Sequence, residues 1–150
     1  MTTATTTPTG TYPLTVRGAN GTLSRSALAT LVVNPAPDFS LSAAPSSRSI
    51  GGTVSSTTYS ITVTPINGFN SPVTLSASGP LIGALGTFSP NPATTSSTLT
   101  ISIMSNTPAG TYTLTLTGTS GSLSHSTTVV LERGRDMSRM SETMPHPIRA

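Results

Sequence analysis

The stretch TPAGTYTLTLTGTSGSLSHSTTVVL, residues 107–131, has a close copy near the start of the same chain, TPTGTYPLTVRGANGTLSRSALATL, residues 7–31. The two copies align without a gap at an offset of 100 residues. The identical positions, in the numbering of the first copy, are Thr7, Pro8, Gly10, Thr11, Tyr12, Leu14, Thr15, Gly18, Gly21, Leu23, Ser24, Ser26 and Leu31. A duplication of this kind predicts a tandem array of similar domains.

Each copy has the pattern of a β-hairpin. In the second copy Tyr112, Leu114 and Leu116 alternate with threonines, and this period of two predicts a strand with one apolar and one polar face. In the first copy Asn20-Gly21 marks the turn, because this dipeptide favours the tight turns that join antiparallel strands. An isolated two-stranded hairpin is only marginally stable in water. We therefore expect each copy to pack its apolar face on another part of a protein.

The composition indicates a β-protein with a Ser/Thr surface. Charged residues make up only 7% of the chain, against about 25% in typical proteins. The 13 Gly and 13 Pro punctuate the sequence as many short strands require. The net charge of +3 comes from seven arginines, four of which lie in the last eighteen residues. The chain has no basic face interleaved with aromatic residues, so it lacks the pattern of a nucleic-acid-binding protein.

The residues available for chemistry are few. There is no cysteine, so disulfides, thiolate metal sites and a cysteine nucleophile are excluded. His125 and His146 are the two histidines, and we expect neither to act in catalysis or to bind a metal. Asp38 is the one acid near the point where the first, partial repeat ends and the next repeat begins. A single acid is too few for a calcium site. The sequence therefore predicts a non-enzyme without cofactor or metal. No apolar run approaches the ~20 residues of a membrane span.

Residues 37–131 have the pattern of a complete β-sandwich. Short alternating strands are separated by turn signals, and residues 46–56 and 80–86 are expected to be irregular. About seven strands of this kind predict an antiparallel sandwich of immunoglobulin type, in which Tyr112 occupies the position of a tyrosine corner. The predicted core consists of Phe39, Tyr59, Ile61, Val63, Val73, Leu75, Phe88, Leu99, Ile101, Tyr112, Leu114, Leu116, Val129 and Leu131, with Phe69 closing one end.

Four segments carry a resemblance to a known family. They are DFSL at residues 38–41, GFNSPVTL at 68–75, TFSPNP at 87–92 and PAGTYTL at 108–114. These segments resemble the bacterial Ig-like repeats of large secreted and cell-surface proteins. The resemblance covers one full repeat and the end of a preceding one. It implies an extracellular or cell-surface location, and it brings no catalytic residue.

The composition changes at residue 132, where a segment rich in Arg and Met begins. We therefore divide the chain into a partial repeat at 1–36, a complete sandwich at 37–131 and a tail at 132–150. Met137, Met140 and Met144 have the spacing of one helical face. The tail is thus expected to be either flexible or a short packed helix.

The first copy consists of the last two strands of a repeat that lacks its earlier strands. A hairpin with an open edge and an apolar face can add to a neighbouring molecule. We predict head-to-tail self-assembly of an extracellular structural subunit through an interface formed by Tyr12, Leu14, Val16, Leu23 and Leu31. The alternatives are a passive spacer or adhesin repeat, and an accessory module that binds polysaccharide beside a secreted enzyme. The polysaccharide alternative is weakened because there is no Trp, and because each of the three tyrosines lies on the apolar face of its predicted strand.

Overall fold

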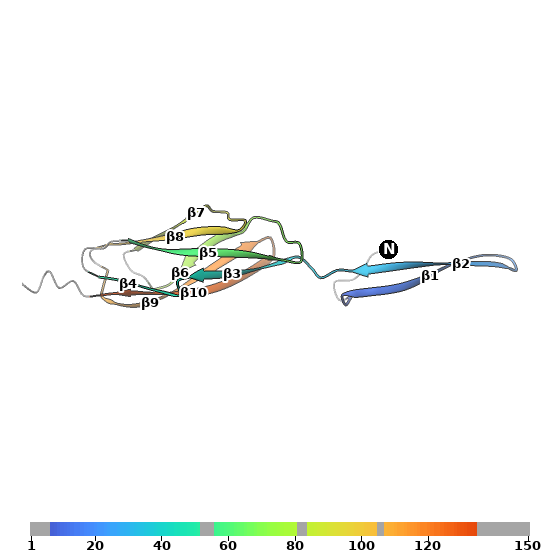
Figure 1. Ribbon diagram of the computed structural model, residues 1–150, viewed down its shortest axis with the longest axis horizontal. Helices are drawn as coiled ribbons and strands as arrows, with labels where there is room; N and C mark the ends of the chain where they lie inside the picture. The colour runs from blue at the N-terminus through green and yellow to red at the C-terminus, as the bar shows by residue number, and fades with distance from the viewer. Residues whose placement is uncertain (1–6, 52–55, 81–83, 105–106, 135–150) are drawn as a thin grey trace, which may run out of the picture. The chain divides into compact units, whose positions relative to one another are not determined.

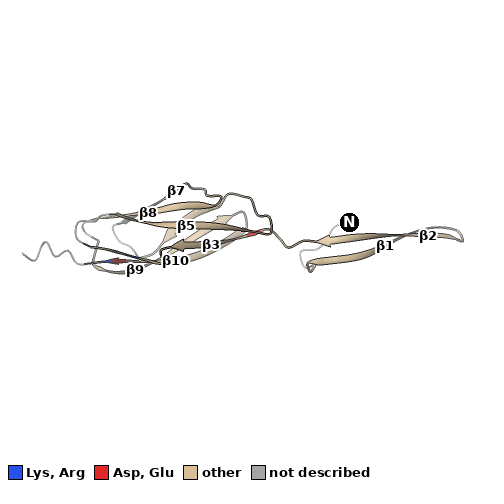
Figure 2. Cartoon of the chain, viewed as in Figure 1, with Lys and Arg blue, Asp and Glu red and all other residues tan. Residues whose placement is uncertain are grey.

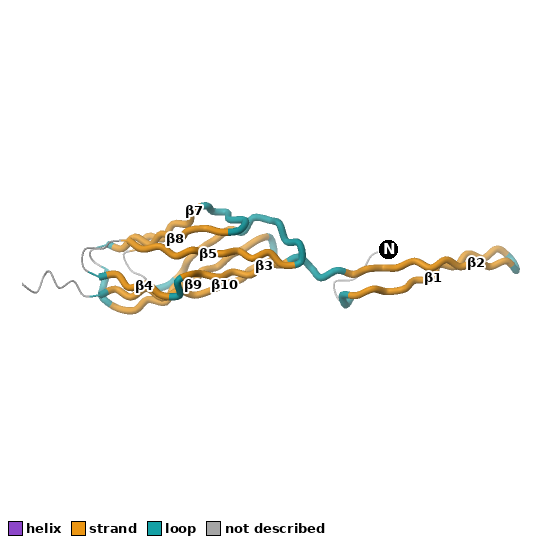
Figure 3. Tube along the Cα trace, viewed as in Figure 1, coloured by secondary structure: helices purple, strands orange, loops and turns teal. Residues whose placement is uncertain are grey.

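The computed structural model describes residues 7–51, 56–80, 84–104 and 107–134 (Figure 1). The chain forms two compact units, residues 1–37 and residues 38–150. Within the described ranges the chain consists of strands and loops without a helix (Figure 3).

The first unit is an antiparallel hairpin. Strand β1 (Gly10–Asn20) pairs with β2 (Leu23–Val33) along its whole length, from Gly10 opposite Val33 to Asn20 opposite Leu23. The turn contains Gly21 at a φ of 58°, a left-handed conformation that glycine adopts without steric cost. The predicted hairpin is therefore confirmed.

The second unit is a sandwich of two four-stranded sheets (Figure 1). One sheet has the order β3-β5-β8-β7 and the other has the order β4-β10-β9-β6. The strand bounds are β3 (Asp38–Ala44), β4 (Ser47–Ile50), β5 (Ser56–Ile66), β6 (Thr74–Ser78), β7 (Ala84–Ser89), β8 (Ser96–Ile103), β9 (Gly110–Ser120) and β10 (Leu123–Arg133). This arrangement matches the two sheets of an immunoglobulin domain, so the predicted fold class is confirmed.

Two details of the sandwich differ from the prediction. The segment 46–56, expected to be a loop, contains the short edge strand β4, which pairs in parallel with β10 from Ser47 opposite Val130 to Ile50 opposite Arg133. Only Ile50 of this strand is buried, so the sequence shows no alternation there. The segment 80–86, also expected to be irregular, contains the start of β7 at Ala84. Both strands lie at the edge of a sheet, where one partner is enough to define a strand.

The core lies between the two sheets. The predicted core residues are buried, except that Phe88 and Tyr112 are half-buried and pack against the core from its margin. The core also contains Ile50, Ala93 and Ile103, and Phe69 closes one end with its ring centroid 5.2 Å from that of Phe39. Tyr59 links the sheets, because its hydroxyl donates a hydrogen bond to the Val130 carbonyl at 2.7 Å. Desolvation by burial raises the pKa of Tyr59.

Strand β10 continues to Arg133, past the boundary predicted at residue 131. The predicted tail from residue 135 onward, including the spaced methionines and His146, lies outside the described residues.

Candidate functional site

The hairpin β1–β2 reproduces the local structure of β9–β10 in detail. Tyr12 lies opposite Leu31, as Tyr112 lies opposite Leu131, and every further pair in the two hairpins has the same offset of 100 residues. Directly opposed residues of an antiparallel pair lie on the same face. The two hairpins therefore present equivalent positions on equivalent faces.

The tyrosine corner is also present in both copies. The Tyr12 hydroxyl donates a hydrogen bond to the Pro8 carbonyl at 2.8 Å, and the Tyr112 hydroxyl donates to the Pro108 carbonyl at 2.7 Å. This hydrogen bond joins the start of each strand to the segment that precedes it, as in immunoglobulin folds. The first unit thus has the local form of the last two strands of such a domain.

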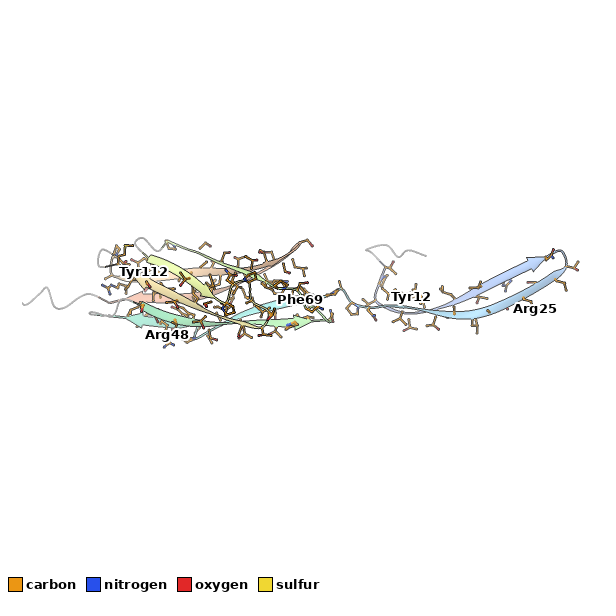
Figure 4. The ribbon with its side chains drawn as sticks, turned by 90° about the horizontal axis from the view of Figure 1, so that it is seen from above. Tyr12, Arg25, Arg48, Phe69 and Tyr112 are labelled. Carbon is orange, nitrogen blue, oxygen red and sulfur yellow. The ribbon has the colours of Figure 1, made fainter. Side chains whose placement is uncertain are left out.

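The two hairpins differ in what covers their apolar faces. In the sandwich, Leu114, Leu116, Val129 and Leu131 are at most 5% exposed, because the opposite sheet covers them. In the first unit the equivalent Val16 is 61% exposed, and Leu14 and Leu31 are only half-buried. Figure 4 shows that this unit is a single layer, with Tyr12 on β1 and Arg25 on β2. The predicted interface residues Tyr12, Leu14, Val16, Leu23 and Leu31 share this one face.

The opposite face of the hairpin carries two apolar residues that sequence reasoning missed. Leu28 and Val32 are 84% and 58% exposed. The equivalent residues in the sandwich are Thr128 and Glu132, which are polar. A comparison of the two copies position by position would have identified both residues. Their exposure means that neither face of the hairpin is polar throughout.

The hairpin also has two open edges. In the sandwich, β6 pairs with the outer edge of β9 and β4 pairs with the outer edge of β10. Among the described strands, β1 and β2 form a sheet of their own without a third strand. The backbone donors and acceptors along their outer edges are therefore available for pairing, and such an edge is a template for another strand.

At the start of the sandwich, Asp38 binds His125. The Nε2 atom of His125 lies 2.7 Å from Oδ1 of Asp38, and both side chains are more than a third exposed, at 38% and 40%. The imidazole packs edge-on against Phe39, with the ring centroids 4.8 Å apart. The polar end of this imidazole therefore contacts a carboxylate. The hydrogen bond from His125, aided by one from the Phe39 amide, lowers the pKa of Asp38.

The described residues offer little for catalysis or for sugar binding. They contain no cluster of three or more His, Asp or Glu side chains that could hold a metal ion, and Figure 2 shows how sparse the charges are. Tyr59 is buried, and Tyr12 and Tyr112 are half-buried, so the described part of the chain lacks an exposed tyrosine platform. Nor does this part contain a helix with the length and apolarity to span a membrane.

The fold is similar to that of several solved structures. The crystal structure of domains 4 and 5 of the S-layer protein SbsC matches 83% of this chain with a TM-score of 0.51 and 15% identity, and this chain covers 58% of it. The crystal structure of residues 31–844 of SbsC matches 85% of this chain with a TM-score of 0.53 and 15% identity, and this chain covers 17% of it. A structure of SbsC domains 4–9 matches 95% of this chain with a TM-score of 0.51 and 14% identity, and 19% of that chain is covered.

At these identities the similarity establishes the fold alone. No family model matches the sequence, and the search of curated proteins found no match. The fold and the hairpin together define the class: an all-β protein with an immunoglobulin-like sandwich and a separate hairpin built like the last two strands of such a sandwich.

Proposed function

We propose that this protein is a non-catalytic structural subunit of an extracellular, cell-surface assembly. The observation that carries the proposal is the uncovered apolar face of the hairpin, whose counterpart in β9–β10 is buried. Burial of a Val or Leu side chain contributes about 1.5–3 kcal/mol. Val16 and Leu23, at 61% and 65% exposed, would therefore stabilise a complex that covered them.

The partner in this proposal is another copy of the same chain, which receives the hairpin. Contact between the hairpin of one copy and the sandwich of the next is head-to-tail, and such contacts produce rings or open filaments. The low charge supports association, since self-repulsion between copies is weak. The likeness of the fold to domains of an S-layer protein is consistent with a role in a surface array.

A passive spacer is the competing function. A spacer requires only a stable sandwich and gives no role to the exposed Val16 and Leu23. The apolar face of the hairpin therefore favours assembly. A polysaccharide-binding module has no such observation in its favour, because Tyr59 is buried and Tyr12 and Tyr112 are half-buried.

The test is deletion of residues 1–35. The remaining chain keeps the whole sandwich, which forms a compact unit from Asp38 onward. We expect the concentrated full-length chain to form elongated assemblies under negative-stain electron microscopy, and the shortened chain to form none. Assemblies that persist unchanged after the deletion would refute hairpin donation.

A further inference from the structure

Neither the backbone conformation nor the surroundings of Gly18 in the hairpin require a glycine at this position. It lies inside a strand, where glycine weakens the sheet because it has no side chain to pack. It does not have a positive φ, and a Cβ atom added to it would meet nothing within 4 Å. The free hairpin would therefore accept a larger residue at this position.

The surroundings of its counterpart Gly118 in the sandwich do require a glycine. A Cβ atom on Gly118 would lie 2.8 Å from Cγ1 of Val73 and 3.3 Å from Cε2 of Phe39. Glycine is thus required where β9 packs against these two side chains. Gly18 has the same requirement only if β1 packs on a surface of the same kind.

Arg25 gives a second, independent indication. It occupies the position equivalent to His125, directly opposite Gly18 as His125 lies opposite Gly118. His125 binds the carboxylate of Asp38. Among the described residues, the Arg25 guanidinium has one hydrogen-bond partner, the neighbouring Ser24 carbonyl at 3.2 Å. A hairpin placed like β9–β10 would bring the Arg25 guanidinium next to a carboxylate, a pairing of opposite charges.

We call the surface covered by β9–β10 the β9–β10 site; it consists of Asp38, Phe39 and Val73 with the inner edges of β4 and β6. We propose that residues 7–33 of one copy bind the β9–β10 site of a second copy, in place of its own β9 and β10. This inference rests on the proposed function and names the receiving surface. Gly18 then lies against Phe39 and Val73 of the second copy, and Arg25 faces its Asp38.

The two hairpins compete for one site. The chain's own hairpin has the better fit, because Leu116 and Val129 are larger than the equivalent Val16 and Ala29. It also acts within the same chain, at an effective concentration of about 1 mM. Donation therefore requires chains that are similarly concentrated, as they are in an array, or a chain whose own hairpin has opened.

The experiment weakens the chain's own hairpin, β9–β10, as a competitor for the site, and it uses the full-length chain. Gly118→Val places a side chain against Val73 and Phe39 and so displaces β9–β10. We expect the refolded variant to form species larger than 15.2 kDa by light scattering, with the circular dichroism of the sandwich retained. Adding Gly18→Val blocks the donor in the same way, and we expect the assembled fraction to fall about tenfold. Adding Thr15→Val, on the opposite face of β1, is the matched control and should leave assembly unchanged.

A charge exchange provides a second readout. In the Gly118→Val background, Arg25→Glu should weaken assembly, and Asp38→Lys in the same chain should restore it. The inference is overturned if the Gly118→Val chain remains a monomer, whether folded or unfolded, or if the Gly18→Val double variant assembles equally well. If assembly resists Gly18→Val but disappears on deletion of residues 1–35, the proposed function stands and this receiving site is rejected.

Discussion

At the residue scale, Asp38 joins the first strand of the sandwich to the last through His125. The hydrogen bond from His125 lowers the pKa of Asp38 from its ordinary value of 3.8. A carboxyl group whose pKa is lower in the folded state stabilises the fold above its unfolded pKa, and this contribution is lost as the pH falls through the folded pKa. The contact is therefore expected to stabilise the sandwich at neutral pH and not in strong acid.

Asp38→Asn tests this dependence. The amide oxygen can still accept the hydrogen bonds, but the charge is absent. We expect the free energies of unfolding of the wild type and the variant to differ most above about pH 5 and to converge towards about pH 2. Denaturant titrations at a series of pH values measure this. A difference that is constant over the whole range would show that the pKa of Asp38 is not lowered in the fold.

At the element scale, the two hairpins form a matched pair for mutagenesis. Gly118→Ala introduces a Cβ atom against Val73 and Phe39, and overpacking of this kind destabilises by about 1–3 kcal/mol. Gly18→Ala introduces the same atom where nothing lies within 4 Å. In dilute solution we expect only Gly118→Ala to lower the denaturant midpoint of the sandwich. Equal effects of the two substitutions would contradict the close packing at Gly118.

The long strands were predictable from sequence, whereas the short edge strand β4 and the start of the edge strand β7 were not. In β9, Leu114 and Leu116 alternate with threonines, because one face of the strand is buried and the other is not. Strand β4 has Ile50 as its one buried side chain, so its backbone pairing with β10 leaves no trace in the sequence. Alternating apolar and polar residues indicate that one face of a strand is buried. A strand that is defined mainly by its hydrogen bonds to one neighbour lacks that signal.

The candidate site was predictable to the same extent. The apolar face with Tyr12, Leu14 and Val16 follows from alternation alone. The importance of Gly18 does not, because it depends on the three-dimensional contact that Gly118 makes with Val73 and Phe39 in the sandwich. The contact between His125 and Asp38 joins residues 87 positions apart, and no local pattern indicates it.

At the scale of the whole molecule, the described residues form one sandwich with a complete core and one hairpin without a core of its own. A two-stranded hairpin is marginal in water, and the exposed Val16, Leu23, Leu28 and Val32 add apolar surface to it. In the proposed assembly, association with another copy covers Val16 and Leu23, which lie on the face equivalent to the buried face of β9–β10. A substitution that makes the apolar face polar should therefore prevent assembly without affecting the sandwich.

In the proposed assembly, one face of the hairpin becomes buried in another copy of the chain. Val16→Asp places a charge on that face, and Thr15→Asp places the same charge on the opposite face of the same strand. The decisive measurement is the light-scattering mass of the three full-length chains refolded at increasing concentrations up to about 1 mM. We predict that the mass of the wild type and of Thr15→Asp rises above 15.2 kDa while Val16→Asp remains at that value. A wild-type mass of 15.2 kDa at every concentration would show that the hairpin does not join one copy to another.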